Sequence, residues 1–184
     1  WTDRVISSSG DWSGNVYDFY FRIYNRLIQD IKVPFRMDGG NRVDDTPVHQ
    51  ALREALANCL VNADYYGRQG LGILKKRDGI TMSNPGSFRI ELDAAKSGGV
   101  SDPRNGTMLK MFNLIDIGER AGSGIPNIFR VWREQGWAAP TFTEQLEPER
   151  TILSLTFEKI GDKKSVINVG DKRNKPIVRT YGNQ

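Results

Sequence analysis

The sequence predicts a two-layer α/β sandwich, with helices on one face of a mixed, mostly antiparallel sheet. Residues 16–31 and 46–65 repeat apolar side chains at the spacing of an amphipathic helix. Residues 71–76 and 79–83 have the composition of strands and are joined at an Asp-Gly pair, which is typical of an antiparallel hairpin. A helix with one apolar side needs a surface to cover it, and a sheet supplies one.

The first forty residues predict a lead-in followed by one helix. Residues 1–15 are rich in Ser, Gly and Asp, with Trp12 as the main apolar anchor, so we expect an irregular segment. In residues 16–31 the apolar positions at helical spacing are Phe19, Ile23, Leu27 and Ile28. A short strand is predicted at 33–37 and a turn at 38–41.

The helix predicted within residues 46–65 is the strongest local signal. Thr46 is suited to cap its start, Pro47 suits the first helical position, and His49 falls in the first turn as a surface or capping residue. One side of this helix should pack on the sheet, and that side carries Leu52, Ala55, Leu56, Cys59, Leu60 and Ala63.

The opposite side of the same helix carries Glu54, Asn58 and Asn62, each one turn beyond the last. Such a row can be a solvated face, which is the usual role of polar residues on a helix. It lacks the lysines and paired charges of most solvent faces, however, and small amides also suit a face covered by a polar ligand. Both interpretations remain open from the sequence.

A glycine-rich turn opens a later helix. The second hairpin strand ends in Asn84-Pro85-Gly86, a long polar segment with a short helix at 107–115 follows, and Gly122-Ser-Gly124 then precedes a predicted helix at 125–135. Helix starts carry unpaired backbone donors, and glycines let a phosphate approach them closely. Residues 150–159 alternate apolar and polar side chains and predict a late strand.

Composition limits the function. With 184 residues, 38% hydrophobic and 26% charged, the chain suits one core domain at 42–159, with residues 1–41 packed on it and 160–184 as a tail or linker. The tail has six basic residues against two acidic ones, which accounts for the net charge of +4. One cysteine and one histidine give poor support for disulfides, zinc sites or Ser-His-Asp chemistry.

No long apolar run and no basic leader is visible, so we expect a cytoplasmic protein that does not contact membranes. The chain begins at Trp1, without an initiator Met, and we therefore expect it to be a piece of something longer.

The order of these motifs resembles the ATP-binding (Bergerat-type) fold of the GHKL superfamily, which includes gyrase B subunits, histidine kinases, MutL-type repair proteins and heat-shock chaperones. More narrowly, it resembles the divergent GHKL domain of bacterial transcriptional regulators also described as "RecG-like helicase C-terminal". The resemblance spans about residues 42–157 and is carried by Leu52 to Asn58, Asp64-Tyr65, Ser83 to Gly86, Arg104-Asn105 and Gly122 to Ile125.

The resemblance implies ATP and Mg²⁺ as ligands. It assigns Glu54 as the general base for the attacking water and Asn58 as the magnesium ligand. Asn84 matches the aspartate that usually binds the adenine amino group, followed by Gly86, and residues 87–121 match the mobile ATP lid. Asn62 shares the polar side of the helix with Glu54 and Asn58. The matches to the glycine box that lines the triphosphate are Gly122, Ser123, Gly124 and Ile125.

The chain also departs from the family pattern. The family often has His-Arg-Asp-Tyr where this chain has Asn62-Ala-Asp-Tyr65, and the glycine box holds no lysine. Charge for the phosphates would then come from Arg104, Arg120 or Lys110. A Walker-type phosphate loop is absent, which argues against motor activity. We therefore expect nucleotide binding rather than fast hydrolysis.

Two alternatives remain. The fold can serve as a nucleotide-free scaffold for homodimerisation or protein interaction. The basic tail can contact DNA or lead to neighbouring DNA-binding parts, and a role in transcription regulation comes from the resemblance alone.

Overall fold

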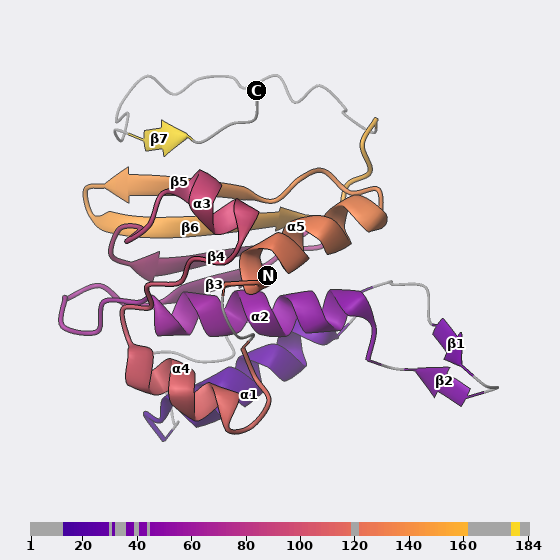
Figure 1. Ribbon diagram of the computed structural model, residues 1–184, viewed down its shortest axis with the longest axis horizontal. Coiled ribbons are helices and arrows are strands. Elements are labelled where there is room, and N and C mark those ends of the chain that lie inside the picture. The colour runs from indigo at the N-terminus through magenta and orange to yellow at the C-terminus, as the bar shows by residue number, and fades with distance from the viewer. Residues whose placement is uncertain are drawn as a thin grey trace.

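The computed structural model describes residues 13–29, 31, 36–38, 41–43, 45–118, 122–161 and 178–180. A five-stranded sheet in the order β3-β4-β6-β5-β7 forms one layer, and helices cover one face of it (Figure 1). The predicted two-layer sandwich is confirmed. All strand pairs described in this sheet are antiparallel.

The structure contains these elements in the described part of the chain. The helices are α1 Val16–Ile28, α2 Pro47–Val61, α3 Leu92–Ser97, α4 Gly106–Asn113 and α5 Gly124–Glu134. The strands of the main sheet are β3 Gly72–Lys75, β4 Gly79–Pro85, β5 Thr141–Leu146, β6 Glu149–Thr156 and β7 Val178–Thr180. A separate two-stranded hairpin is made by β1 Arg36–Asp38 and β2 Asn41–Val43.

Helix α2 lies at the centre of the molecule, with α5 along one side and α1 and α4 along the other (Figure 1). Its start is capped as predicted, because the Thr46 side chain accepts from the His49 backbone and the His49 ring accepts from the Thr46 backbone. The helix also contacts β4. It is therefore buried around most of its circumference, whereas the sequence predicted one buried side facing the sheet.

The core lies between the helices and the sheet. Leu52, Leu56 and Leu60 of α2 are fully buried, and each such side chain contributes about 1.5–3 kcal/mol through burial. The other helices and the sheet add the buried side chains of Tyr20, Leu27, Ile128, Val131, Trp132, Ile80, Met82 and Leu155.

Strand β4 continues through Pro85, two residues further than predicted. The pairing of β4 with β3 ends at Ser83, which lies opposite Gly72. The pairing of β4 with β6 continues to Pro85. Pro85 has no N–H to donate, so it fits where the neighbouring strand has ended. Its carbonyl instead accepts a hydrogen bond from the backbone of Asp64, at 2.9 Å. This bond joins the end of α2 to the end of β4.

Helix α3 and strands β2, β5 and β7 were not predicted from the sequence. Helix α3 is six residues long within the segment expected to be a polar connection, and it is held by the buried side chains of Leu92 and Ala95. Strand β5 was missed, and β7 forms within the predicted tail by pairing with β5. Strand β1 overlaps the end of the strand predicted at 33–37 and pairs with β2, while residues 33–35 of that strand and 39–40 of the predicted turn lie outside the described residues.

Residues 1–12, 30, 32–35, 39–40, 44, 119–121, 162–177 and 181–184 lie outside the described part, and with them Trp12, Arg120 and most of the predicted tail. Among the helices that the structure describes, none has both the length and the apolar character needed to cross a membrane.

Removing the hydroxyl of Tyr20 should stabilise the protein. This side chain is 0% exposed, and its hydroxyl has no hydrogen-bond partner among the described residues. Burial raises the pKa of Tyr20 above its usual value. An unpaired buried polar group is unfavourable, so Tyr20→Phe should raise the free energy of unfolding by about 1 kcal/mol in urea titrations.

Tyr24→Phe is the matched control, because the Tyr24 hydroxyl accepts a hydrogen bond from Arg53 at 3.2 Å. This variant should be unchanged or less stable. A loss of stability in Tyr20→Phe as large as in Tyr24→Phe would contradict the assignment.

Candidate functional site

A cavity of about 110 Å³ lies between α2, β4, α5 and the segment before α4. We call it the central cavity. A single buried water needs about 10–15 Å³ measured in this way, so the space is far larger than a packing defect. Most of the predicted site residues line it: Glu54, Asn58, Asn62, Asn84, Gly122, Gly124 and Ile125. Gly86, Arg104 and Ser123 are not among the lining residues.

Glu54 on α2 lies close to Gly124 at the start of α5. A Cβ added to Gly124 would lie 1.9 Å from Oε1 of Glu54 and 2.5 Å from its Cδ. A larger residue at this position would force the Glu54 side chain or α5 to shift. The contact brings two segments that are far apart in sequence to one wall of the cavity.

The carboxylate of Glu54 is also held from its own helix. Nδ2 of Asn58 donates to Oε1 of Glu54 at 2.9 Å, across one helical turn. Glu54 as a whole is 7% exposed, so at this residue the polar side of α2 is not a solvated face. Its position at the N-terminal end of α5 is favourable for negative charge. Because Nδ2 is used in this way, Oδ1 is the atom that Asn58 can offer to a cation.

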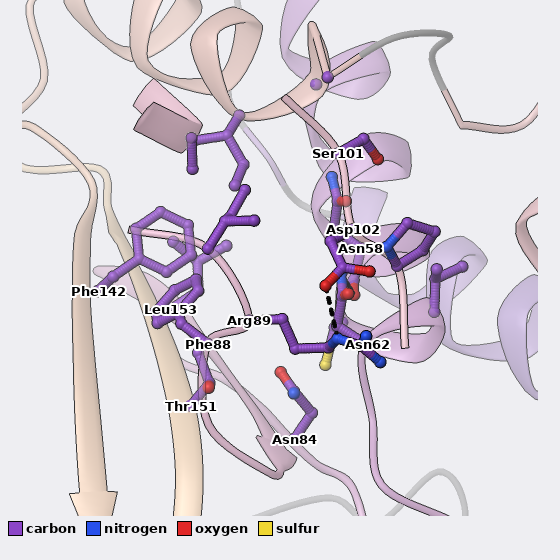
Figure 2. Close-up of a pocket in the computed structure, with 18 of the residues that line it drawn as sticks. Asn58, Asn62, Asn84, Phe88, Arg89, Ser101, Asp102, Phe142, Thr151 and Leu153 are labelled. Atoms are coloured by element: carbon purple, nitrogen blue, oxygen red, sulfur yellow. Dashed lines mark hydrogen bonds and ion pairs between the residues drawn. The ribbon is translucent and has the colours of Figure 1, made fainter. Parts of the chain in front are cut away.

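Asn84 lies on β4 at the floor of the cavity, opposite Thr151 of β6 (Figure 2). Both side chains are buried. The Thr151 hydroxyl donates to the carbonyl of Gly86 at 2.8 Å, which fixes the backbone just beyond Asn84. Gly86 has φ +97°, and a Cβ there would lie 2.9 Å from Nη2 of Arg104. Both its conformation and its close neighbour require glycine.

Arg104 holds backbone in place. Its Nε donates to the carbonyl of Asn62 at 3.2 Å, and its Nη2 donates to the carbonyl of Ser87 at 3.1 Å. The next residue, Asn105, donates from its side chain to the carbonyls of Val61 and Ala63. Together these two residues fasten the start of α4 to the end of α2 and to the segment after β4.

The other positive side chains predicted to bind the phosphates do not line the cavity in the described part of the chain. Lys110 is exposed on α4 and does not line the cavity, and Arg120 lies outside the described residues. Asn62 lines the cavity, but its Nδ2 donates to the carbonyl of Asn58 at 3.0 Å. Its Oδ1 accepts from the backbone of Arg104 at 3.4 Å, so the Asn62 amide already joins α2 to the segment before α4.

Residues 98–102, which we call the lid tip, lie against the glycine loop formed by residues 122–124. A Cβ on Gly122 would lie 2.5 Å from the carbonyl oxygen of Val100. A Cβ on Gly98 would lie 3.1 Å from Cγ of Pro126. The lid tip is therefore folded down onto the loop that was predicted to line a triphosphate.

The cavity has two chemically different walls (Figure 2). One wall presents polar side chains of α2 and the lid tip, namely Asn58, Asn62, Ser101 and Asp102. The other presents the apolar side chains of Phe88, Phe142 and Leu153. A flat heterocycle suits the second wall and a charged, hydrated group suits the first, which is the usual composition of a small-molecule site.

Several lining residues were missed in the sequence. Phe142 belongs to β5, which has no apolar alternation in its sequence because Glu144 takes the next buried position. Arg89 and Asp102 form an ion pair at 2.8 Å between Nε and Oδ2, and both line the cavity. They belong to irregular segments 13 residues apart, and no periodic pattern relates them.

Metal binding would depend on the ligand. Among the described residues there is no group of three His, Cys, Asp or Glu side chains that could hold a metal ion. Mg²⁺ is often held by one or two protein oxygens together with phosphate oxygens and waters. Asn58 and Glu54 can supply such a partial set, so the residues fit a magnesium ion that arrives with phosphates.

Residues 72–153 match the model of a family described as "Putative ATP-dependent DNA helicase recG C-terminal". This match confirms the resemblance to a divergent GHKL-like ATPase domain. The matched stretch contains Asn84, Gly86, Arg104 and the glycine loop and begins after α2, so Glu54 and Asn58 stand outside it.

Among solved structures, the chain is similar to the crystal structure of the DIP2311 protein from Corynebacterium diphtheriae, with a TM-score of 0.59. The two share 17% sequence identity over 76% of this chain, so the likeness shows the fold alone. The match covers 29% of that protein. No curated protein matches the chain.

Substituting Gly124 should disturb the contact between α2 and α5. Because the added Cβ would overlap the Glu54 carboxylate, Gly124→Ala should lower the free energy of unfolding by about 1–3 kcal/mol. Gly106→Ala is the control, since its Cβ would meet nothing closer than 4.0 Å. Adding Glu54→Ala to Gly124→Ala should restore part of the loss in urea titrations, and equal losses in both glycine variants would count against the packing described.

The thiol of Cys59 should be unreactive in the folded protein. Cys59 is 5% exposed, and burial raises its pKa from 9.0 to about 12. Because the thiolate is the reactive form, iodoacetamide should label native protein slowly even near pH 9.0 and should label urea-unfolded protein rapidly. Mass spectrometry over time measures both rates. Similar rates in the two states would show that the thiol is open to solvent.

Proposed function

We propose that this domain binds ATP together with Mg²⁺ in the central cavity. The observation that carries the proposal is the convergence of three distant segments on one space. Glu54 and Asn58 come from α2, Asn84 comes from β4, and the glycine loop comes from the start of α5. The match to an ATPase-like family supports the same ligand class.

Each segment would have its own task. The Asn84 amide at the floor can hydrogen-bond the edge of adenine, while Phe88, Phe142 and Leu153 offer an apolar surface to its ring. The glycine loop and the first turn of α5 place backbone donors beside the polar wall, where phosphates would lie. When bound, Mg²⁺ would neutralise phosphate charge, and Asn58 would hold it from the protein side.

Binding is favoured over fast hydrolysis. Glu54 would be the general base, but its Oε1 already accepts from Asn58 and its side chain is nearly buried against Gly124. A base must reach a water at hydrogen-bond distance before it can act. Glu54 would therefore need to be released from this contact, and any ATPase activity would be slow.

We propose that the domain is part of a larger regulatory protein. The cellular role that the resemblance suggests is transcription regulation. DNA contact by neighbouring domains or the basic tail, and a homodimer as the assembly, are further parts of this proposal. A nucleotide-free scaffold is the alternative, and the lid tip folded onto the glycine loop favours it. A stable dimer in size-exclusion chromatography that is indifferent to ATP would support the scaffold.

Nucleotide binding can be measured by thermal shift and isothermal titration calorimetry. ATP with Mg²⁺ should raise the Tm of the wild-type protein, because a ligand of the native state stabilises it. Asn84→Ala should lower the affinities for ATP and for adenosine alike, by about tenfold, through loss of the adenine contact. Asn58→Ala should weaken ATP in the presence of Mg²⁺ and leave adenosine binding nearly unchanged.

Asn127→Ala is the matched control, because this amide lies on α5 and contacts Arg130 rather than the cavity. It should bind ATP as the wild type does. An unchanged wild-type Tm at millimolar nucleotide would exclude the proposed function.

A further inference from the structure

We propose that Arg89 is a specificity-determining residue for anionic ligands of the central cavity, and that Asp102 occupies it when no such ligand is bound. This inference rests on the proposed function, and it names a cation other than Arg104, Arg120 and Lys110, which the sequence had suggested. Arg89 lies between β4 and α3, and Asp102 lies in the lid tip.

The geometry places this pair at the polar wall. Nε of Arg89 lies 2.8 Å from Oδ2 of Asp102, and Figure 2 draws this bond within the cavity that Asn58 and Asn62 also line. The two side chains are 43% and 45% exposed, so solvent reaches them. Partly exposed ion pairs are weak, because water screens them and competes for both partners. A phosphate can therefore exchange with Asp102 at low energetic cost.

The charges of the cavity favour such an exchange. Among the described lining residues, Arg89 is the only cation, and the carboxylates are Glu54 and Asp102. A triphosphate entering this space would meet two negative side chains and one positive one, so its favourable charge contact would be with the Arg89 guanidinium. The guanidinium presents its donors in a planar fork that matches phosphate oxygens, which makes arginine a good phosphate ligand.

The exchange would also act on the lid tip. Gly98 and Gly99 at its start have φ of +81° and +80°, and Arg104 and Asn105 fasten the chain directly after it. The ion pair with Arg89 thus attaches the lid tip at Asp102, and the chain that follows the lid tip is held separately by Arg104 and Asn105. Transfer of Arg89 from Asp102 to a phosphate would remove that attachment and leave the rest of the fold in place.

Calorimetric titration with ATP, ADP and adenosine in the presence of Mg²⁺ tests the inference. Arg89→Gln should weaken the affinity for ATP by about tenfold. It should leave the affinity for adenosine within about twofold of the wild-type value, because adenosine carries no phosphate. Asp102→Asn should strengthen ATP binding by several fold. The gain from Asp102→Asn should be at least about threefold smaller in an Arg89→Gln background, since the released guanidinium is then missing.

Asp18 and Arg22 on α1 provide the matched control. They form an ion pair of 2.9 Å with 31% and 49% exposure, and neither lines the cavity. Arg22→Gln and Asp18→Asn should leave all three affinities unchanged. Far-UV circular dichroism and Tm verify that every variant is folded.

The outcomes separate the two proposals. If the wild type binds none of the three ligands, the proposed function fails and this inference with it. If the wild type binds ATP but Arg89→Gln leaves that affinity unchanged, or weakens adenosine as much as ATP, the inference alone is overturned.

Discussion

The contact between the Glu54 carboxylate and Gly124 determines how the site is assembled. It sets α5 directly against α2 at a point where a Cβ would overlap the Glu54 side chain. The same carboxylate is bonded to Asn58, so the position of α5 and the orientation of the polar side of α2 are linked. The glycine loop lies beside the cavity because it immediately precedes this contact. An acid buried at the start of a helix thus serves packing and, in the proposed function, chemistry.

The segments that form the rest of the cavity are held by hydrogen bonds to their backbone carbonyls. Arg104 and Asn105 bond the end of α2 and the chain after β4 through backbone carbonyls, and Asp64 bonds the carbonyl of Pro85. Thr151 fixes Gly86 from the neighbouring strand. These bonds hold the floor and one edge of the cavity in a single rigid frame. The lid tip contacts this frame through Val100 against Gly122 and through the Arg89–Asp102 ion pair.

The sequence was sufficient for features that depend on local periodicity. The cap of α2, its polar row and the hairpin of β3 and β4 follow from the spacing of a few residues, and they were predicted. Strand β5 was missed because Glu144 occupies a buried position. Its carboxylate is satisfied by the backbone N–H of Phe88 at 2.7 Å, a partner that no sequence pattern reveals.

The roles of the two arginines were hidden for a similar reason. Arg104 was assigned to phosphate because its charge was visible in the sequence, whereas its bonding partners are backbone carbonyls that every residue possesses. Arg89 was overlooked because its place beside Asp102 depends on the path of two irregular segments. Charge can be counted from a sequence, but the partner of a charge depends on tertiary structure.

The short length of the lid tip limits how the cavity can exchange its contents. Four residues, 100–103, lie between the glycine pair and the Arg104 attachment, and the five steps from Gly99 to Arg104 span at most about 17 Å when extended, so the middle of the segment can rise by roughly half of that. A flap of this size rearranges on the nanosecond to microsecond scale of loops, faster than the hinge motions of whole domains. The rates of ligand binding and release would then be set by the contacts of the ligand with the frame. Motion of the lid tip would not delay the response of the domain to a change in cellular ligand concentration.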